Sequence, residues 1–227
     1  MAAKSPVALI LGAGPNIGTS VARGFASKGY KIALAARSVD AAASTDSQLN
    51  IPSDFTKPAD IVNAFQKVTQ TFGPPSVVVY NAATAAFTPA DDPFTLQVED
   101  LNRDMAVNAT SPYIAAQQAV KGFAELPESA ARTFIYTGNI LNTQSLPRFI
   151  SPGMSKSAGA HMIATAADAY KDRGYKFYYV DERKPDGTAK YKVDGDAHAE
   201  HFFKLSEDKT QGPWLQTFVK DVGYVKF

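Results

Sequence analysis

Short apolar runs alternate with longer stretches of mixed apolar and polar residues along almost the whole chain. The runs are rich in Val, Ile, Ala and Tyr and are apolar nearly throughout, which is typical of strands buried on both faces of a sheet. The predicted strands cover residues 6–13, 31–37, 49–54, 76–82, 132–138, 175–180 and 214–219.

Between these strands the chain shows helical patterns, in which apolar residues recur at three- to four-residue intervals. Strands that alternate with helical crossovers imply a mostly parallel sheet that is covered on both faces. We therefore predict an α/β, doubly wound Rossmann fold with a sheet of about seven strands. The predicted helices cover residues 17–29, 58–72, part of 95–125, a segment that opens at Ser151, and about 196–206.

The length of 227 residues suits one domain, so residues 1–227 are expected to form a single dinucleotide-binding domain. Residues 181–212 interrupt the alternation because they are polar, rich in Gly and poorly periodic. We predict an irregular loop there that contains the short helix at about 196–206. This loop serves as a substrate lid or as a mobile connector. The ligand of such a fold lies beyond the carboxyl ends of the strands.

Composition and charge exclude several classes of function. The chain has 23 basic and 22 acidic residues and no basic block, so nucleic-acid binding lacks its main energetic term. It has no cysteine and three scattered histidines, so no metal site is expected. The apolar run Val7 to Leu11 is too short for a signal sequence or a membrane span, which predicts a cytoplasmic protein with no membrane partner.

A glycine-rich turn joins the first predicted strand to the first predicted helix. In "LGAGPNIG", Gly12, Gly14 and Gly18 stand where side chains would clash in a tight strand-to-helix turn. The backbone at Asn16 and Ile17 then opens the helix, whose free N–H groups favour a diphosphate. The pattern therefore predicts a dinucleotide site, and its alternative is a merely tight turn.

Arg37 ends the second predicted strand. Enzymes that prefer the non-phosphorylated cofactor usually carry an acidic residue there for the ribose diol, whereas arginine suits a 2′-phosphate. This favours NADP(H) over NAD(H) and weighs against S-adenosylmethionine. The alternative is a solvated surface arginine.

With these features, residues 6–180 resemble the short-chain dehydrogenase/reductase family. The resemblance rests on "LGAGPNIG", "SDFT", "YNAA", "VNATSPY" and "SPGMSK". It implies that Asp54 lies near the adenine, that Asn81 closes the fourth strand at the cofactor, and that Lys156 holds the nicotinamide ribose. It also implies that Asn108 positions a water molecule, and it makes a homo-oligomer, a dimer or tetramer, the expected assembly.

Two catalytic positions of the family are altered. The family's tyrosine stands four residues before its lysine, and here that position is Pro152, which has no ionisable group and no N–H. The family's serine aligns with Asn139, which could orient a carbonyl oxygen in its place. The chain also resembles an atypical branch of the family in which the tyrosine is often replaced.

Another residue could therefore supply the proton. Tyr178 and Tyr179 end the sixth predicted strand, and we take Tyr178 as the candidate acid, with plain pocket lining as its alternative. Tyr136 lies three residues before Asn139 on the fifth predicted strand, so it is expected to point to the opposite face of the sheet from Asn139 and to belong to the core. Ser151 followed by Pro152 reads as an N-cap and first position of a helix.

Three functions remain open. The first is an NADP(H)-dependent oxidoreductase that acts on a small carbonyl or alcohol substrate. The second is a non-redox isomerase, cyclase or dehydratase with a pocket lined by Phe87, Phe149 and Met154. The third is a non-catalytic NADPH sensor, because fold alone does not fix function.

Overall fold

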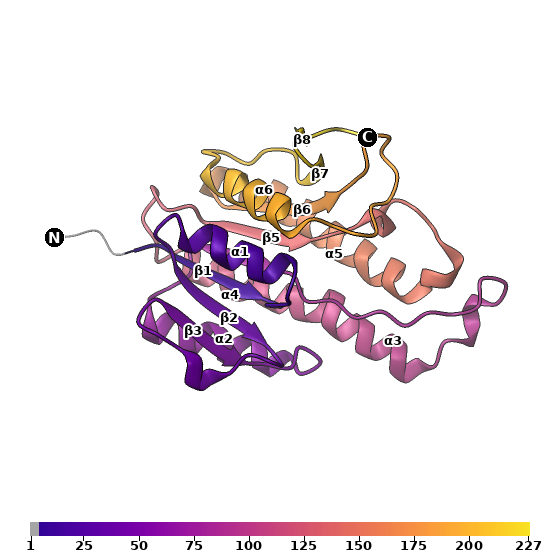
Figure 1. The fold of residues 1–227 in the computed structure, drawn as a ribbon, viewed down its shortest axis with the longest axis horizontal. Coiled ribbons are helices and arrows are strands. Elements are labelled where there is room, and N and C mark those ends of the chain that lie inside the picture. The colour runs from indigo at the N-terminus through magenta and orange to yellow at the C-terminus, as the bar shows by residue number, and fades with distance from the viewer. Residues whose placement is uncertain (1–4) are drawn as a thin grey trace.

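The eight strands of the described chain form one sheet in the order β3-β2-β1-β4-β5-β6-β7-β8 (Figure 1). The computed structural model describes residues 5–227, so the first four residues of the predicted domain lie outside the described residues. Strands β1 to β7 run parallel, and β8 pairs antiparallel with β7. The predicted doubly wound Rossmann architecture is therefore confirmed.

All seven predicted strands are present, and their ends differ from the predicted ones by at most two residues. The additional strand, β8, has only two residues and follows a turn. The strands are β1 (Val7–Leu11), β2 (Lys31–Ala36), β3 (Gln48–Pro52), β4 (Val77–Tyr80), β5 (Thr133–Thr137), β6 (Lys176–Glu182), β7 (Leu215–Val219) and β8 (Gly223–Tyr224).

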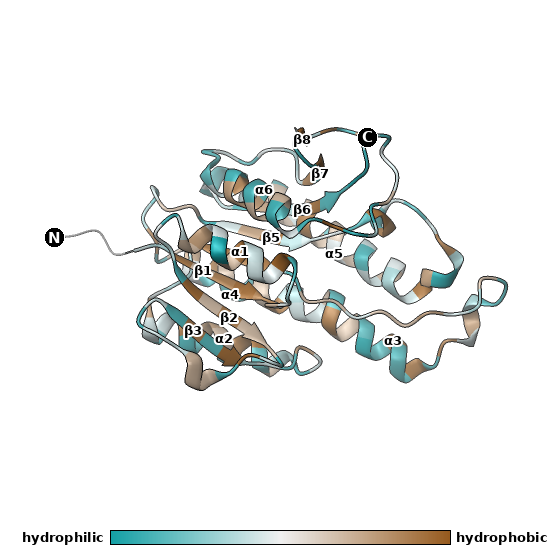
Figure 2. Cartoon of the chain, viewed as in Figure 1, coloured by the Kyte–Doolittle hydropathy of each residue, from teal (hydrophilic) through white to brown (hydrophobic). Residues whose placement is uncertain are grey.

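Helices cover both faces of the sheet, and buried apolar side chains fill the space between them. The central strands, such as β1, are coloured mostly as hydrophobic in Figure 2. Helices α1 and α6 pack on one face, while α2, α4 and α5 pack on the other. Helix α3 extends away from the sheet (Figure 1). The helices are α1 (Ile17–Ala26), α2 (Pro58–Thr71), α3 (Val98–Met105), α4 (Ser111–Phe123), α5 (Ile150–Tyr170) and α6 (Gly195–Glu207).

Successive residues of the buried strands contribute to different cores. Leu9 and Tyr80 face α2, α4 and α5, whereas Ile10 and Val79 face α1 and α6. This alternation explains why the strands are apolar at every position. From β1 the sheet continues through β2 to β3, and from β4 it continues in the other direction through β5 to β8. The strand order reverses between β1 and β4, so the crevice for a ligand lies between their carboxyl ends.

The start of α5 differs from the prediction. The helix begins at Ile150, after Phe149, so Ser151 is not its N-cap and Pro152 is its third residue. The buried Ser151 hydroxyl instead donates to the Asp104 carboxylate of α3, with 2.7 Å between the oxygens. The serine thus connects two helices, a role that its local sequence did not indicate.

Residues 181–212 are more regular than predicted. Strand β6 continues to Glu182, and an isolated bridge between Arg183 and Ala189 closes a short hairpin. Helix α6 follows, close to its predicted bounds, and its Phe202 packs with Phe25 of α1 in one core. This half of the segment is therefore a layer of the fold, and a role as substrate lid or connector stays a prediction.

Within residues 5–227, no helix is both long enough and apolar enough to cross a membrane.

Candidate cofactor-binding and active site

Two glycines at the turn from β1 into α1, Gly12 in the loop and Gly18 in the helix, allow close packing of the backbone. Gly12 has a φ of 101°, and a Cβ there would lie 2.2 Å from the Ala82 nitrogen. A Cβ at Gly18 would lie 2.7 Å from the Cα of Ala13. The Asn81 side chain donates to the Gly12 carbonyl at 2.9 Å and ties the loop to the end of β4. These contacts fix the loop at the crevice.

Gly14 has a different surrounding. A Cβ added there would meet nothing within 4 Å, so the space above this residue is open. The first N–H groups of α1, which begins at Ile17, have no partner within the helix and lie at its positive end. Open space beside such a helix end fits the diphosphate of a dinucleotide.

Gly12→Ala is expected to lower the free energy of unfolding by about 2–4 kcal/mol, because the methyl group meets backbone and φ is positive. Urea denaturation measures this loss. Gly14→Ala is the matched control: its methyl group meets open space, so stability stays within about 1 kcal/mol of the wild type. Equal destabilisation by both variants would contradict this assignment.

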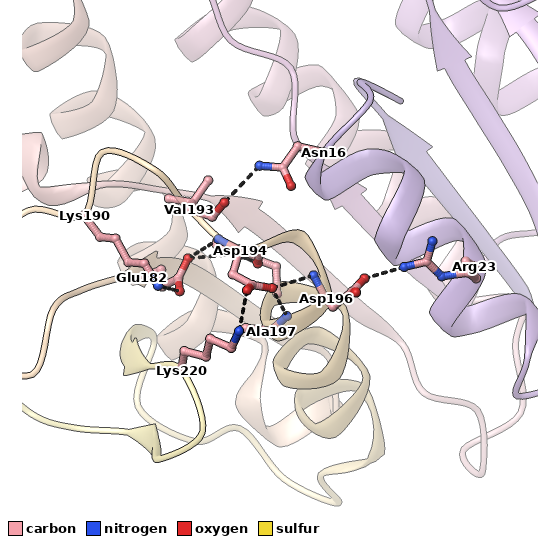
Figure 3. Close-up of polar contacts among 10 residues, drawn as sticks. Asn16, Arg23, Glu182, Lys190, Val193, Asp194, Asp196, Ala197 and Lys220 are labelled. Atoms are coloured by element: carbon pink, nitrogen blue, oxygen red, sulfur yellow. Dashed lines mark hydrogen bonds and ion pairs between the residues drawn. The ribbon is translucent and has the colours of Figure 1, made fainter.

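The side chain of Asn16 is directed away from this space. Its amide nitrogen donates to the Val193 carbonyl at 3.0 Å, in the segment that leads into α6 (Figure 3). Gly195 approaches the same turn so closely that a Cβ there would lie 2.6 Å from the Asn16 amide oxygen. Only the backbone of Asn16 is therefore placed to meet a diphosphate, and its side chain holds the segment before α6.

A pocket of about 560 Å³ opens beside the loop. A larger pocket of about 890 Å³ lies at the amino ends of the strands, near Pro6 and Lys176. Open α/β sheets bind ligands at the carboxyl ends of their strands, so we assign the smaller pocket as the candidate site. Its lining includes Gly12, Gly14, Arg37, Asp54, Asn81, Thr84, Arg103 and Val107.

Arg37 and Asp54 lie at the tips of the neighbouring strands β2 and β3 and both line this pocket. The Asp54 carboxylate accepts hydrogen bonds from the backbone nitrogen and the hydroxyl of Thr56, at 3.1 and 2.9 Å. These bonds hold the pKa of Asp54 below its usual range, and Arg37 contributes to the same effect. Arg37 is exposed and brings a permanent positive charge to the pocket.

Asn108 occupies a π-helical turn, Ala106–Thr110, between α3 and α4. Its buried side chain donates to the Thr84 carbonyl at 2.7 Å and to the Ser155 hydroxyl at 3.2 Å. The hydroxyl of Tyr136 donates to the Asn108 carbonyl at 2.6 Å, which satisfies a group that the irregular turn releases. Asn108 thus joins the loop after β4 to helix α5.

Lys156 projects from α5 onto the end of β5. Its ammonium group donates to the Thr137 carbonyl at 2.9 Å and lies 4.3 Å from the centre of the Tyr136 ring. The residue is only 4% exposed, and this burial lowers the pKa of Lys156 to about 7, although Asp181 opposes the shift. An amine with such a pKa can hold or release a proton near neutral pH.

The two altered positions lie on different elements, Pro152 on α5 and Asn139 after β5. Pro152 is buried one turn earlier on α5, and its carbonyl accepts a hydrogen bond from Ser155. Asn139 follows β5, and its amide oxygen accepts from the backbone nitrogen of Leu141 at 3.1 Å. The oxygen of Asn139 is thus engaged in a local turn, while its amide nitrogen is the donor that could face a substrate.

The prediction for Tyr178 is wrong. Its side chain lies in the core beneath α1 and α6, on the opposite face of the sheet from Lys156, and its hydroxyl accepts from the Gly212 nitrogen at 3.2 Å. Burial raises the pKa of Tyr178 to about 12. The next residue, Tyr179, faces α5, but its hydroxyl donates to the Asn139 carbonyl and burial raises its pKa as well.

Tyr136 is fully buried, as predicted, but it lies on the side of Lys156 rather than away from it. Burial raises the pKa of Tyr136 well above its ordinary value. Its hydroxyl is committed to the Asn108 carbonyl. Tyr136 is therefore a structural support beneath the lysine.

Sequence reasoning missed three consecutive charged residues, Asp181, Glu182 and Arg183, which are all buried at the end of β6. Arg183 pairs with Asp181, while Glu182 accepts from Lys190 and from the Asp194 nitrogen (Figure 3). Burial raises the pKa of Asp181 to about 6. The signal was present in the run "DER", which directly follows an apolar strand.

Two of the three residues predicted to line a substrate pocket are neighbours, and the pocket itself stays a prediction. Phe87 and Phe149 pack edge to face, with ring centres 5.1 Å apart, so they join the loop after β4 to the turn before α5. Phe87 and Met154 are about half exposed, at 57% and 49%. Apolar surface thus remains open close to the start of α5.

Comparison with known proteins gives one consistent likeness. A family model described as short chain dehydrogenase matches residues 6–181. "Short chain dehydrogenase/reductase dmxR12" of Cryptosporiopsis sp. (strain 8999) is 47% identical, over 98% of this chain and 95% of the relative. "Hydroxynaphthalene reductase-like protein Arp2" of Metarhizium guizhouense (strain ARSEF 977) is 29% identical, over 86% of this chain and 72% of the relative.

Solved structures share the fold. A metagenomic short-chain oxidoreductase in complex with NADP superposes with a TM-score of 0.79 at 18% identity, over 96% of this chain and 99% of that one. A short chain dehydrogenase from Bacillus anthracis str. 'Ames Ancestor' has the same TM-score of 0.79 at 17% identity, over 95% of each chain.

Proposed function

Because the chain belongs to the short-chain dehydrogenase family, we propose that it is an NADP(H)-dependent oxidoreductase that interconverts a small carbonyl compound and its alcohol. One observation carries the proposal. The open glycine turn at Gly14 follows β1, and the buried ammonium group of Lys156 lies at the end of β5, so both lie at the carboxyl ends of the strands. A dinucleotide whose diphosphate lies at Gly14 extends along these strand ends to Lys156.

The residues of the site fit this cofactor. The N-terminus of α1 and the backbone of residues 12–18 receive the diphosphate. Asp54 lies on the adenosine side, Arg37 meets the 2′-phosphate, and Lys156 binds the nicotinamide ribose. The cofactor, when bound, supplies the hydride for reduction or accepts it in oxidation. The NADP found in the metagenomic relative supports this choice.

Lys156 is our candidate for the proton donor, since Pro152 has no proton to give. In the reducing direction one N–H bond of the ammonium group breaks and an O–H bond forms on the substrate oxygen, which leaves a neutral amine. The reverse step returns the proton in oxidation. The amide nitrogen of Asn139 donates a hydrogen bond to the substrate oxygen. Asn108 holds the loop after β4 against α5 through its bonds to Thr84 and Ser155.

We propose an aromatic substrate within this class. Phe87, Phe149 and Met154 present apolar surface near the start of α5, and aromatic rings pack well on such surfaces. The name of the Arp2 relative, a hydroxynaphthalene reductase-like protein, points in the same direction. A homo-oligomer, dimer or tetramer, and a cytoplasmic location stay predictions from sequence.

The test has two steps. We expect NADPH to bind with an increase in its fluorescence, and to be oxidised, with loss of its absorbance, by at least one member of a panel of aliphatic, aromatic and quinone carbonyls. Failure to bind NADPH would contradict the proposal. Tight binding without turnover of any carbonyl would contradict the redox part and favour the non-redox enzyme or the sensor.

A further inference from the structure

The end of β6 brings a carboxylate to the buried lysine. Thr137 of β5, whose carbonyl receives the Lys156 ammonium group, pairs in register with Val180 of β6. Asp181 is the next residue, and its side chain lies on the same face as Tyr179, which is the face covered by α5. The charges of Lys156 and Asp181 therefore lie on the same face of the sheet and attract each other inside the protein, at more than ion-pair distance.

Each of these buried charges would be costly without a partner of opposite charge. Lys156 is 4% exposed and Asp181 is 3% exposed, and an isolated buried charge is strongly disfavoured. Arg183 fixes one oxygen of Asp181 through its Nε and is itself anchored by a bond of 2.9 Å to the Gly187 carbonyl. The carboxylate is thus held in place by the strand and by the arginine.

We propose that Asp181 is the counter-ion of Lys156 and a positioning residue for the cofactor, since it keeps the lysine as an ammonium group directed at the nicotinamide ribose. This inference rests on the proposed function, because it assigns a role toward the same cofactor. No other part of that proposal depends on Asp181.

The charge state has a defined dependence on pH. Asp181 faces Arg183 on its own strand and Lys156 on α5, and Glu182 adjoins it along β6. Burial lowers the pKa of Lys156 to about 7, and the Asp181 carboxylate limits that decrease. Without the carboxylate the pKa of Lys156 falls further, so the lysine is neutral at a lower pH.

The expected result concerns binding and not turnover. An ammonium group forms charge-assisted hydrogen bonds to ribose hydroxyls, which are roughly twice as strong as neutral ones. NADPH affinity of the wild type should therefore decrease as the pH rises through about 7. In Asp181→Asn this decrease should move to lower pH, and affinity near neutral pH should fall about fivefold to tenfold.

The measurement is a fluorescence titration of NADPH from about pH 6 to about pH 9, with thermal unfolding of every variant. Adenosine 2′,5′-bisphosphate is the reference probe. It has the 2′-phosphate but no nicotinamide ribose, so its pH profile should be the same in the wild type and in Asp181→Asn. This probe separates titration of the phosphate from titration of the lysine.

Two further variants complete the test. Glu182→Gln removes an equally buried carboxylate from the other face of β6. The pH at which its NADPH affinity is half lost should equal that of the wild type. Asp181→Asn combined with Arg183→Gln removes both charges of the pair, so that no arginine is left unpaired. This double variant should fold even where Asp181→Asn is unstable, and its NADPH affinity should be lost at a lower pH than in the wild type.

An NADPH profile of folded Asp181→Asn, or of the folded double variant, that coincides with the wild-type profile would overturn the inference and leave the proposed function intact. Equal shifts for NADPH and for the reference probe would overturn it too, because the effect would then not involve the ribose of the nicotinamide. Failure of the wild type to bind NADPH at any pH would instead refute the proposed function itself.

Discussion

Replacing Lys156 by methionine is expected to lower kcat/KM for carbonyl reduction by roughly a hundredfold or more. The substitution removes the ammonium donor that we assign both to the nicotinamide ribose and to the substrate oxygen. It keeps an unbranched aliphatic side chain of similar length in the same buried position. Steady-state kinetics with saturating NADPH separate the loss of proton transfer, which lowers kcat, from the loss of cofactor affinity.

The same variant has a distinct signature in stability. A buried lysine carries a desolvation cost, so an apolar replacement of similar length should leave the melting temperature equal or higher. Lys171→Met is the matched control, since Lys171 is exposed just after α5 and pairs with Asp168. It should keep wild-type kinetics. Activity of Lys156→Met within about threefold of the wild type would contradict both roles of the lysine.

Arg37→Ala is expected to weaken NADPH binding about tenfold to a hundredfold, with NADH affinity little changed. The reason is that Arg37 lines the pocket at the tip of β2, where the 2′-phosphate distinguishes the two cofactors. Because Arg37 is exposed, salt should screen its contribution, so the difference between the variant and the wild type should shrink at high ionic strength. Fluorescence titration of both cofactors measures the effect.

Arg173→Ala serves as the control, because Arg173 is an exposed arginine that packs on Tyr170 and Tyr175, in the turn after α5. It should not change the affinity for either cofactor. Equal weakening of NADPH and NADH binding by Arg37→Ala would contradict recognition of the 2′-phosphate. It would then assign Arg37 to a contact that both cofactors share.

The sequence predicted the layers of the fold because burial on both faces leaves a strong pattern. A strand such as Val77–Tyr80 has no polar face, and the helices between such strands are long enough to cross over the sheet. The glycine turn was equally predictable, since positive φ and close backbone contact at Gly12 admit no other residue at low cost. These signals are local, and each lies within a few residues.

The errors came from contacts that no local pattern carries. Tyr178 and Tyr179 are neighbours inside β6, and which of them faces α5 depends on the alternation of side chains along the strand, which the sequence alone did not determine. Ser151 followed by proline is a good helix start, but a buried carboxylate 47 positions away binds its hydroxyl. The role of Asp181 likewise depends on a partner in another element, Lys156, so the residue could be identified only in the folded chain.

The C-terminal strand β8 has a consequence for self-association. An outer strand with free backbone groups invites another chain to continue the sheet. Here Gly223–Tyr224 covers Phe218 and Val219, and the pairing continues where the Val225 nitrogen donates to the Thr217 carbonyl at 3.0 Å. A second copy could extend the sheet past β7 only after it displaced this return of the chain. The short last strand therefore protects the backbone groups of β7 from pairing with another chain.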